Sequence, residues 1–115
     1  MAGQNRQSKK PVHDSVCFHC QQRVEKYLKA LLEEIGQHVP KIHDLDGLLN
    51  DLVVHHPQLR SLRRGCLFLS DFAVNARYPG DDATKRQAVA AMRWATKVRA
   101  AARQLLNIRE RRRKQ

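Results

Sequence analysis

The sequence predicts an all-α fold, a small up-and-down helical bundle of about four helices. Apolar residues recur at three- and four-residue spacing in several stretches, which is the period of a helix with one buried side. Aromatic residues make up only 5% of the chain, so the composition suits helices better than a sheet of aromatic and β-branched residues. The 115 residues suffice for one modest core, so we expect a single domain.

The first helix is expected to begin at Asp14 or Ser15, either of which can cap it, and to end at Gly36, which supplies the backbone freedom of a helix exit. We expect its core-facing side to consist of residues at helical spacing, namely Val16, Cys20, Val24, Tyr27, Leu28, Leu31 and Ile35. Glu25 stands four residues before Lys29, an arrangement that favours a surface ion pair.

A short second helix is expected to start near His43 or Asp44 and to stop around His55. Four leucines at helical spacing should fill its buried side, namely Leu45, Leu48, Leu49 and Leu52. The segment therefore predicts a helix that is largely buried on one side.

A third helix is expected from Pro57, because a proline in the first turn of a helix loses no hydrogen bond. It should end near Asn75, since Pro79 and Gly80 cannot continue it. Its inward residues should be Leu59, Leu62, Cys66, Leu69 and Phe72 or Ala73.

The longest helix is expected to open at Asp81 or Asp82, because acidic residues suit the positive end of a helix dipole. One arc of this helix is apolar and is made by Ala88, Ala91, Ala95, Val98, Ala102, Leu105 and Leu106. The opposite side carries a basic stripe of Arg86, Arg93 and Lys97. The many alanines predict that a neighbouring helix packs closely against the arc.

The formal net charge of +11 is unevenly distributed. Residues 85–115 hold eleven basic residues and one acid, whereas residues 14–84 hold eight against ten. We therefore expect a disordered basic lead at 1–13, a helical domain at 14–108 and a basic tail at 109–115. This pattern favours a polyanionic partner such as RNA, nucleotide phosphates or an acidic protein, and the alternative is a solvated face that only aids solubility.

Three cysteines and the absence of an apolar leader or membrane-length run predict free, mostly buried thiols in a reducing cytoplasm. Cys17 and Cys20 have the spacing of half a zinc site, but no second pair of ligands follows at the expected distance. No glycine-rich phosphate loop, serine elbow or metalloprotease helix occurs either. We expect no metal and no cofactor, and assign no catalytic residue.

Two places remain candidates for ligand contact. His43 is either a packed residue at a helix start or a functional one. Arg77 can hold a phosphate through its planar fork while Tyr78 stacks on a base, and the alternative is that Tyr78 packs beside a simple turn.

Four segments resemble HEPN domains, in the right order over about 18–106. The first signature is matched by Phe18-His19-Cys20-Gln21-Gln22-Arg23-Val24-Glu25-Lys26-Tyr27-Leu28-Lys29-Ala30-Leu31-Leu32. His43-Asp44-Leu45 resembles the second, Asn75-Ala76-Arg77-Tyr78-Pro79-Gly80 resembles the third, and the helix starting near Thr84 is similar to the closing helix. The resemblance implies a helical bundle, commonly dimeric, often encoded beside a minimal nucleotidyltransferase and counted with toxin-antitoxin or nucleotide-binding systems.

The resemblance further implies contact with nucleotide or RNA phosphate through Lys26, Lys29, His43 and Arg77. Our hypothesis is therefore a nucleotide- or RNA-binding module that works with a nucleotidyltransferase, in which Tyr78 helps to orient the ligand. One alternative is a metal-independent ribonuclease toxin that uses His43 with Arg77. Another is a bundle that only docks a protein.

The sequence departs from the family pattern in two ways. Ribonuclease members place a histidine shortly after an arginine near the last helices, but no histidine follows His56 and the only similar spacing joins Arg6 to His13. Ribonuclease chemistry by that motif is therefore disfavoured. Members also carry a helix before the first signature, which residues 1–13 are not expected to form. The exposed apolar strip that would result predicts a homodimer.

Overall fold

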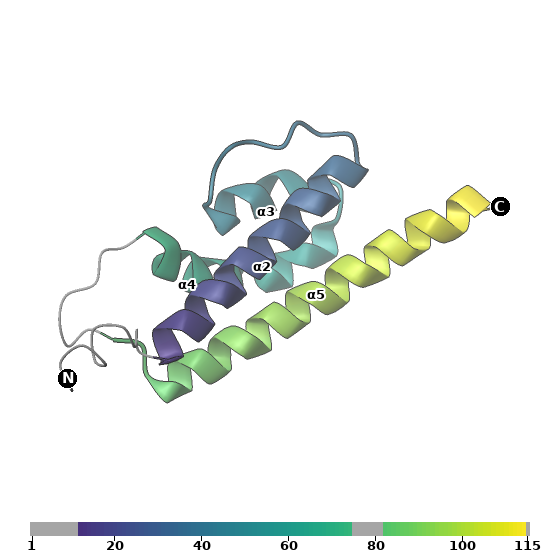
Figure 1. Cartoon of the computed structure of the whole chain (residues 1–115). Coiled ribbons are helices and arrows are strands. Elements are labelled where there is room, and N and C mark those ends of the chain that lie inside the picture. Colours follow the sequence, from purple (N-terminus) through teal and green to yellow (C-terminus); the bar gives the residue numbers. More distant parts are fainter. Residues whose placement is uncertain (1–11, 75–81, 115) are drawn as a thin grey trace, which may run out of the picture.

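The computed structural model describes residues 12–74 and 82–114, and their side chains except those of 73, 74 and 108–114. Every regular element in these ranges is a helix, which confirms the predicted all-α class (Figure 1). The elements are α2 (Val12–Glu34), α3 (Leu45–Val53), the 3-10 helix η1 (Pro57–Leu62), α4 (Arg63–Val74) and α5 (Lys85–Lys114). No helix of the described part is long and apolar enough to cross a bilayer.

Helices α2 and α5 form the long side of the bundle and run in the same direction (Figure 1). They begin together, because the carboxylate of Asp14 in the first turn of α2 accepts a hydrogen bond of 2.7 Å from the backbone N–H of Ala83, just before α5. Helix α2 also packs against α3 and α4, and α5 touches α4 and η1. The core therefore surrounds α2.

The buried side of α2 differs from the predicted one. Its buried residues are Cys17, Gln21, Val24, Leu28, Leu31 and Leu32. Four of the predicted residues, Val16, Cys20, Tyr27 and Ile35, are only partly buried. The difference arises because α2 is covered from several sides, by α5 and by α3 and α4. Helix α2 starts two residues before the predicted cap, and the exit at Gly36 is confirmed by its left-handed backbone (φ +76°).

Helix α3 is the element that the sequence predicted best. Its four leucines are fully buried. Asp44 is its N-cap and accepts a hydrogen bond of 3.2 Å from the N–H of Asp46. The hydroxyl of Ser70 in α4 accepts a second one, 3.0 Å from the N–H of Leu45. Both bonds satisfy backbone donors that a helix start leaves without intrahelical partners.

The single helix predicted from Pro57 is wrong in one respect, because the segment divides into η1 and α4 at Arg63. Leu59 and Leu62 are both buried and stand three residues apart, which places them on one edge of a 3-10 helix with three residues per turn. Cys66 and Leu69 continue the buried side in α4 as predicted. The predicted end near Asn75 lies outside the described residues.

Helix α5 begins at Lys85, later than the predicted start at Asp81 or Asp82. Two hydrogen bonds between Thr84 and Gln87 cap its N-terminus. The hydroxyl of Thr84 accepts from the N–H of Gln87 at 3.1 Å, and the side-chain oxygen of Gln87 accepts from the N–H of Thr84 at 2.9 Å. The predicted apolar arc is confirmed, with its first five members buried and Leu105 and Leu106 packed against the core.

None of the three cysteines forms a disulfide, as predicted, and Cys17 and Cys66 are buried. Burial, followed by the nearby charge of Asp46, raises the pKa of Cys66 to about 12. Burial also raises the pKa of Cys20, and the charge of Arg23 opposes this only in part. Because the thiolate is the reactive form, the fold suppresses the reactivity of both thiols.

We therefore expect iodoacetamide at pH 8 to modify the folded protein slowly, at Cys20 first, and to leave Cys66 intact. With a pKa of about 12 its thiolate fraction is of the order of 10⁻⁴ at this pH, and the core blocks access. In guanidinium chloride all three thiols should react at the rate of a free cysteine. Intact-mass and peptide mass spectrometry at timed intervals measures this. Early labelling of Cys66 under native conditions would contradict the packing.

Candidate functional site

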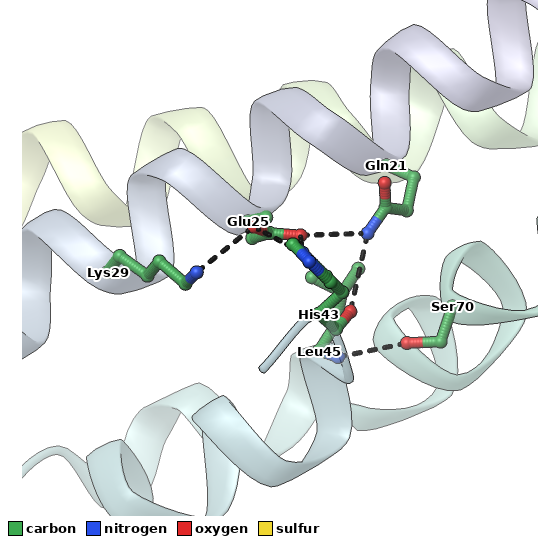
Figure 2. Close-up of polar contacts among 6 residues, drawn as sticks. All are labelled: Gln21, Glu25, Lys29, His43, Leu45 and Ser70. Atoms are coloured by element: carbon green, nitrogen blue, oxygen red, sulfur yellow. Dashed lines mark hydrogen bonds and ion pairs between the residues drawn. The ribbon is translucent and has the colours of Figure 1, made fainter. Parts of the chain in front are cut away.

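Polar side chains from two segments converge on the carboxylate of Glu25 in the middle of α2 (Figure 2). The ammonium of Lys29 lies 3.1 Å from Oε2. The Nδ1 atom of His43 lies 3.0 Å from each carboxylate oxygen. The amide of Gln21 donates to Oε1 at 3.2 Å. Glu25 thus joins three polar groups at one point.

The sequence builds this cluster from a helix row and a nearby connection. Gln21, Glu25 and Lys29 are four residues apart, so they stack on successive turns of one side of α2. His43 comes from the residues just before α3, and the amide of Gln21 also donates to its carbonyl oxygen at 3.4 Å. Since Ser70 holds the neighbouring Leu45, the start of α3 is tied to both α2 and α4 (Figure 2).

The electrostatic balance of the cluster keeps Glu25 ionised. Burial raises the pKa of this carboxyl, but hydrogen bonds from His43, Lys29 and Gln21 outweigh it, so the pKa lies below its ordinary value. The side chain is 15% exposed. One carboxylate therefore offsets the charge of Lys29 and holds the imidazole of His43.

Glu25→Gln is expected to lower the free energy of unfolding at pH 7 by about 1–2 kcal/mol, because it weakens charge-assisted hydrogen bonds in a partly buried cluster. The pKa of Glu25 is lower in the folded protein than in the unfolded chain, so its ionised carboxylate stabilises the fold at pH values above the ordinary pKa of a glutamate. This stabilisation is lost as the pH falls through the pKa of the folded state. The difference from the natural protein should therefore be constant above about pH 5 and shrink below it.

Urea unfolding at several pH values measures this difference. Glu33→Gln is the matched control, because it removes the same charge from an exposed position of the same helix. An equal effect of the two substitutions at pH 7 would show that the cluster adds nothing to stability.

The imidazole of His43 is held at one nitrogen, and no hydrogen-bond partner from the described residues meets the other. Its Nδ1 faces the carboxylate and carries the proton of that contact, while the side chain as a whole is 72% exposed. The Nε2 atom therefore remains for a ligand, as an acceptor in the neutral ring and as a donor in the protonated one. The ammonium of Lys29, which approaches the same carboxylate, has further N–H donors.

The structure brings together two of the five residues that the sequence singled out, Lys29 and His43. Lys26 is exposed on α2 and directly follows Glu25. Because successive residues of an α-helix are rotated by about 100°, Lys26 lies beside the cluster rather than in it. Arg77 and Tyr78 lie outside the described residues.

Sequence reasoning missed the part played by Glu25 and Gln21, the two residues that organise the cluster. The available signal was the four-residue spacing from Gln21 through Glu25 to Lys29, of which only the last pair was used. No group of three metal-binding side chains gathers anywhere in residues 12–74 and 82–107.

These features define an all-helical domain with a basic last helix and an imidazole that a carboxylate holds in place. The HEPN domain family model matches residues 4–105, nearly the whole of the 115-residue chain. The chain therefore belongs to the HEPN domain family, and the resemblance found in its sequence is confirmed. At family level the protein is a nucleotide- or RNA-related module. Searches of curated proteins and of solved structures found no match.

Proposed function

We propose that this protein binds nucleotides or RNA through their phosphates, with Nε2 of His43 and the ammonium of Lys29 as the first contacts. The observation that carries the proposal is the hydrogen bond between the carboxylate of Glu25 and Nδ1 of His43, which fixes the ring and directs its other nitrogen outward. A fixed donor loses little conformational entropy when it binds. Membership of a nucleotide- or RNA-related family supports the same assignment.

Three more residues complete the proposed site. Lys26 extends the positive surface along α2, where it would meet a neighbouring phosphate of a longer ligand. Arg77 would bind phosphate through two parallel N–H bonds, and Tyr78 would orient the base by stacking. The net charge of +11 adds long-range attraction that salt weakens.

His43→Ala is expected to weaken binding of a labelled RNA oligonucleotide or a nucleoside triphosphate about tenfold, because one charge-assisted hydrogen bond is lost. Lys29→Gln should weaken binding and reduce the salt dependence of the RNA affinity by about one phosphate contact. Fluorescence anisotropy at two salt concentrations measures both effects.

Arg60→Gln is the matched control, because it removes one positive charge from an exposed position on η1. It should change the affinity far less than either site variant. Absence of any binding by the natural protein at low salt would refute the proposed function, and equal losses in all three variants would refute the site.

The contact between Glu25 and His43 also favours a second candidate, a metal-independent ribonuclease. A carboxylate that orients an imidazole is a recurring support for general acid or base catalysis. This candidate predicts RNA cleavage that persists in the presence of a chelator, disappears in His43→Ala and is strongly reduced in Glu25→Gln. If the natural protein leaves RNA intact, the binding role stands alone.

The proposal extends to a minimal nucleotidyltransferase as partner, to a toxin-antitoxin role and to a homodimer, all of which rest on the family resemblance. The exposed apolar strip that was expected on the first helix does not support the homodimer, because α5, α3 and α4 cover that side of α2. Co-expression with the product of the adjacent gene should yield a stable complex on gel filtration. Expression of the protein with and without that product, followed by growth measurement, tests the toxin-antitoxin role. Light scattering of the purified chain should give twice the monomer mass.

A further inference from the structure

The outward side of α5 carries a narrow apolar row in a basic setting. Val89, Met92, Thr96 and Ala100 follow one another at steps of three, four and four residues, so they form one line along the helix. Val89 is 44% exposed and Met92 is 53% exposed, which is unusual for two large apolar side chains next to each other.

The polar member of this row does not interrupt it. The hydroxyl of Thr96 donates to the carbonyl oxygen of Met92 at 2.9 Å, within α5 itself. An apolar side chain can therefore cover Thr96 without depriving its hydroxyl of a hydrogen bond. The four residues act as one apolar strip, which we call the α5 seam.

Basic side chains border the α5 seam on both sides. On a helix of 3.6 residues per turn, Arg86 and Arg93 lie along one border and Arg99 lies along the other, all of them exposed. Lys85 and Arg103, also exposed, lie in line with the seam at its two ends. No acidic residue occurs from position 85 to position 107. A shallow hollow of about 520 Å³ opens at the start of the seam, lined by Lys85, Arg86, Val89, Ala90 and Arg93.

From this surface we infer that α5 docks an acidic amphipathic helix of a partner protein. Such a helix would lay leucine-like side chains, three and four residues apart, along the α5 seam and over the hollow, with glutamates or aspartates facing the two basic borders. This is the pattern by which helices recognise one another, with a central apolar row and flanking charges that select the partner.

Charge decides between this partner and the other occupants. A second copy of the chain would bring the same basic borders together and be repelled. The phosphates of an RNA strand would bind the arginines but would not bury the exposed apolar side chains of Val89 and Met92. Only a partner that is both acidic and apolar uses every feature of the surface. The surface is made by α5, whereas the proposed phosphate contacts come from α2, the residues before α3 and Arg77, none of which belongs to α5, so the two proposals can fail separately.

The test uses synthetic peptides of about 18 residues as probes of the partner. The first has leucines at steps of three and four with glutamates beside them, and the second has the same composition with the leucines dispersed. A single-stranded RNA oligonucleotide is the third probe. Binding to the full chain is measured by fluorescence anisotropy at two salt concentrations, with the variants Val89→Thr/Met92→Gln and Arg86→Gln/Arg93→Gln.

We expect the patterned peptide to bind at least tenfold more tightly than the dispersed one. The seam variant should abolish that preference and leave RNA binding unchanged, while the arginine variant should weaken both peptides. Leu67→Gln is the matched control, because it removes an apolar side chain that is 54% exposed on α4. All substituted residues are exposed, and circular dichroism checks that the variants fold.

Three results would overturn the inference. The first is equal binding of the two peptides, which would reduce the surface to a general attraction for negative charge. The second is an unchanged preference in the seam variant, or an equal loss in Leu67→Gln. The third is RNA binding that the seam variant weakens as much as peptide binding, which would make RNA the occupant.

Discussion

Leu28→Ala is expected to lower the free energy of unfolding by about 2–5 kcal/mol, the usual cost of removing a fully buried leucine and leaving a cavity. Leu28 lies on α2, the helix that packs against α5, α3 and α4, so few neighbours can move into the space without disturbing another contact. In a domain of this size each kcal/mol lowers the melting temperature by roughly 4–8 °C. The loss is a large fraction of the stability of a typical domain.

Urea unfolding followed by circular dichroism measures the effect. Leu67→Ala is the matched control, because the same substitution at an exposed position of α4 should change the stability by less than about 0.5 kcal/mol. If Leu28→Ala does not fold, Leu28→Met keeps the volume and should cost less than about 1.5 kcal/mol. Similar small losses in Leu28→Ala and Leu67→Ala would show that α2 is not the centre of the core.

The same core explains which parts of the fold the sequence could predict. In α3 the leucine spacing predicts the buried side and a start near His43 or Asp44, and the structure confirms both, although the helix ends at Val53, two residues before the predicted stop at His55. The division between η1 and α4 could not be predicted, because the three-residue step from Leu59 to Leu62 fits an α-helix as well as a 3-10 helix. Local spacing leaves such a choice open until the neighbours of the segment are known.

The buried side of α2 shows a second limit. The apolar pattern placed Cys20 inward and left Gln21 out, whereas Gln21 is buried and Cys20 only partly so. A glutamine enters the core because its amide donates to Glu25 and to the carbonyl of His43, and a buried amide with partners costs little. Glu25 can be recognised as a partner from its four-residue spacing, but the carbonyl of His43 cannot be recognised without the contact between residue 43 and α2.

The sequence could predict the candidate site only in part. The pair of Glu25 and Lys29 follows from their spacing and is confirmed at 3.1 Å. The hydrogen bond between His43 and the same carboxylate joins residues eighteen positions apart, and it depends on how α3 packs on α2. One carboxylate thus supports both the fold and the proposed site. His43→Ala is the cleaner test of binding, because it leaves the pair of Glu25 and Lys29 in place.

Gly65→Ala is expected to lower the free energy of unfolding by about 1–3 kcal/mol, although alanine is the better helix former. Gly65 is buried in α4 under the indole of Trp94 from α5. A Cβ atom at this position would lie 2.3 Å from Cδ2 and Cε3 of the ring and 2.8 Å from Cγ. These atoms are close to the root of the side chain, so the ring can escape only by moving the α4 and α5 contact apart or by changing its rotamer.

The sign of the effect should reverse when the indole is removed. A Trp94→Ala background removes the three atoms nearest to the added methyl group, so Gly65→Ala should become neutral or stabilise by up to about 1 kcal/mol through helix propensity. Such a reversal in a double-mutant cycle isolates the contact between the two residues. Gly47→Ala in α3 is the matched control, because its nearest atom is the flexible Ile42 side chain at 3.2 Å. Urea unfolding measures the four proteins of the cycle and the control, and a cycle without coupling would mean that α4 and α5 do not meet at this glycine.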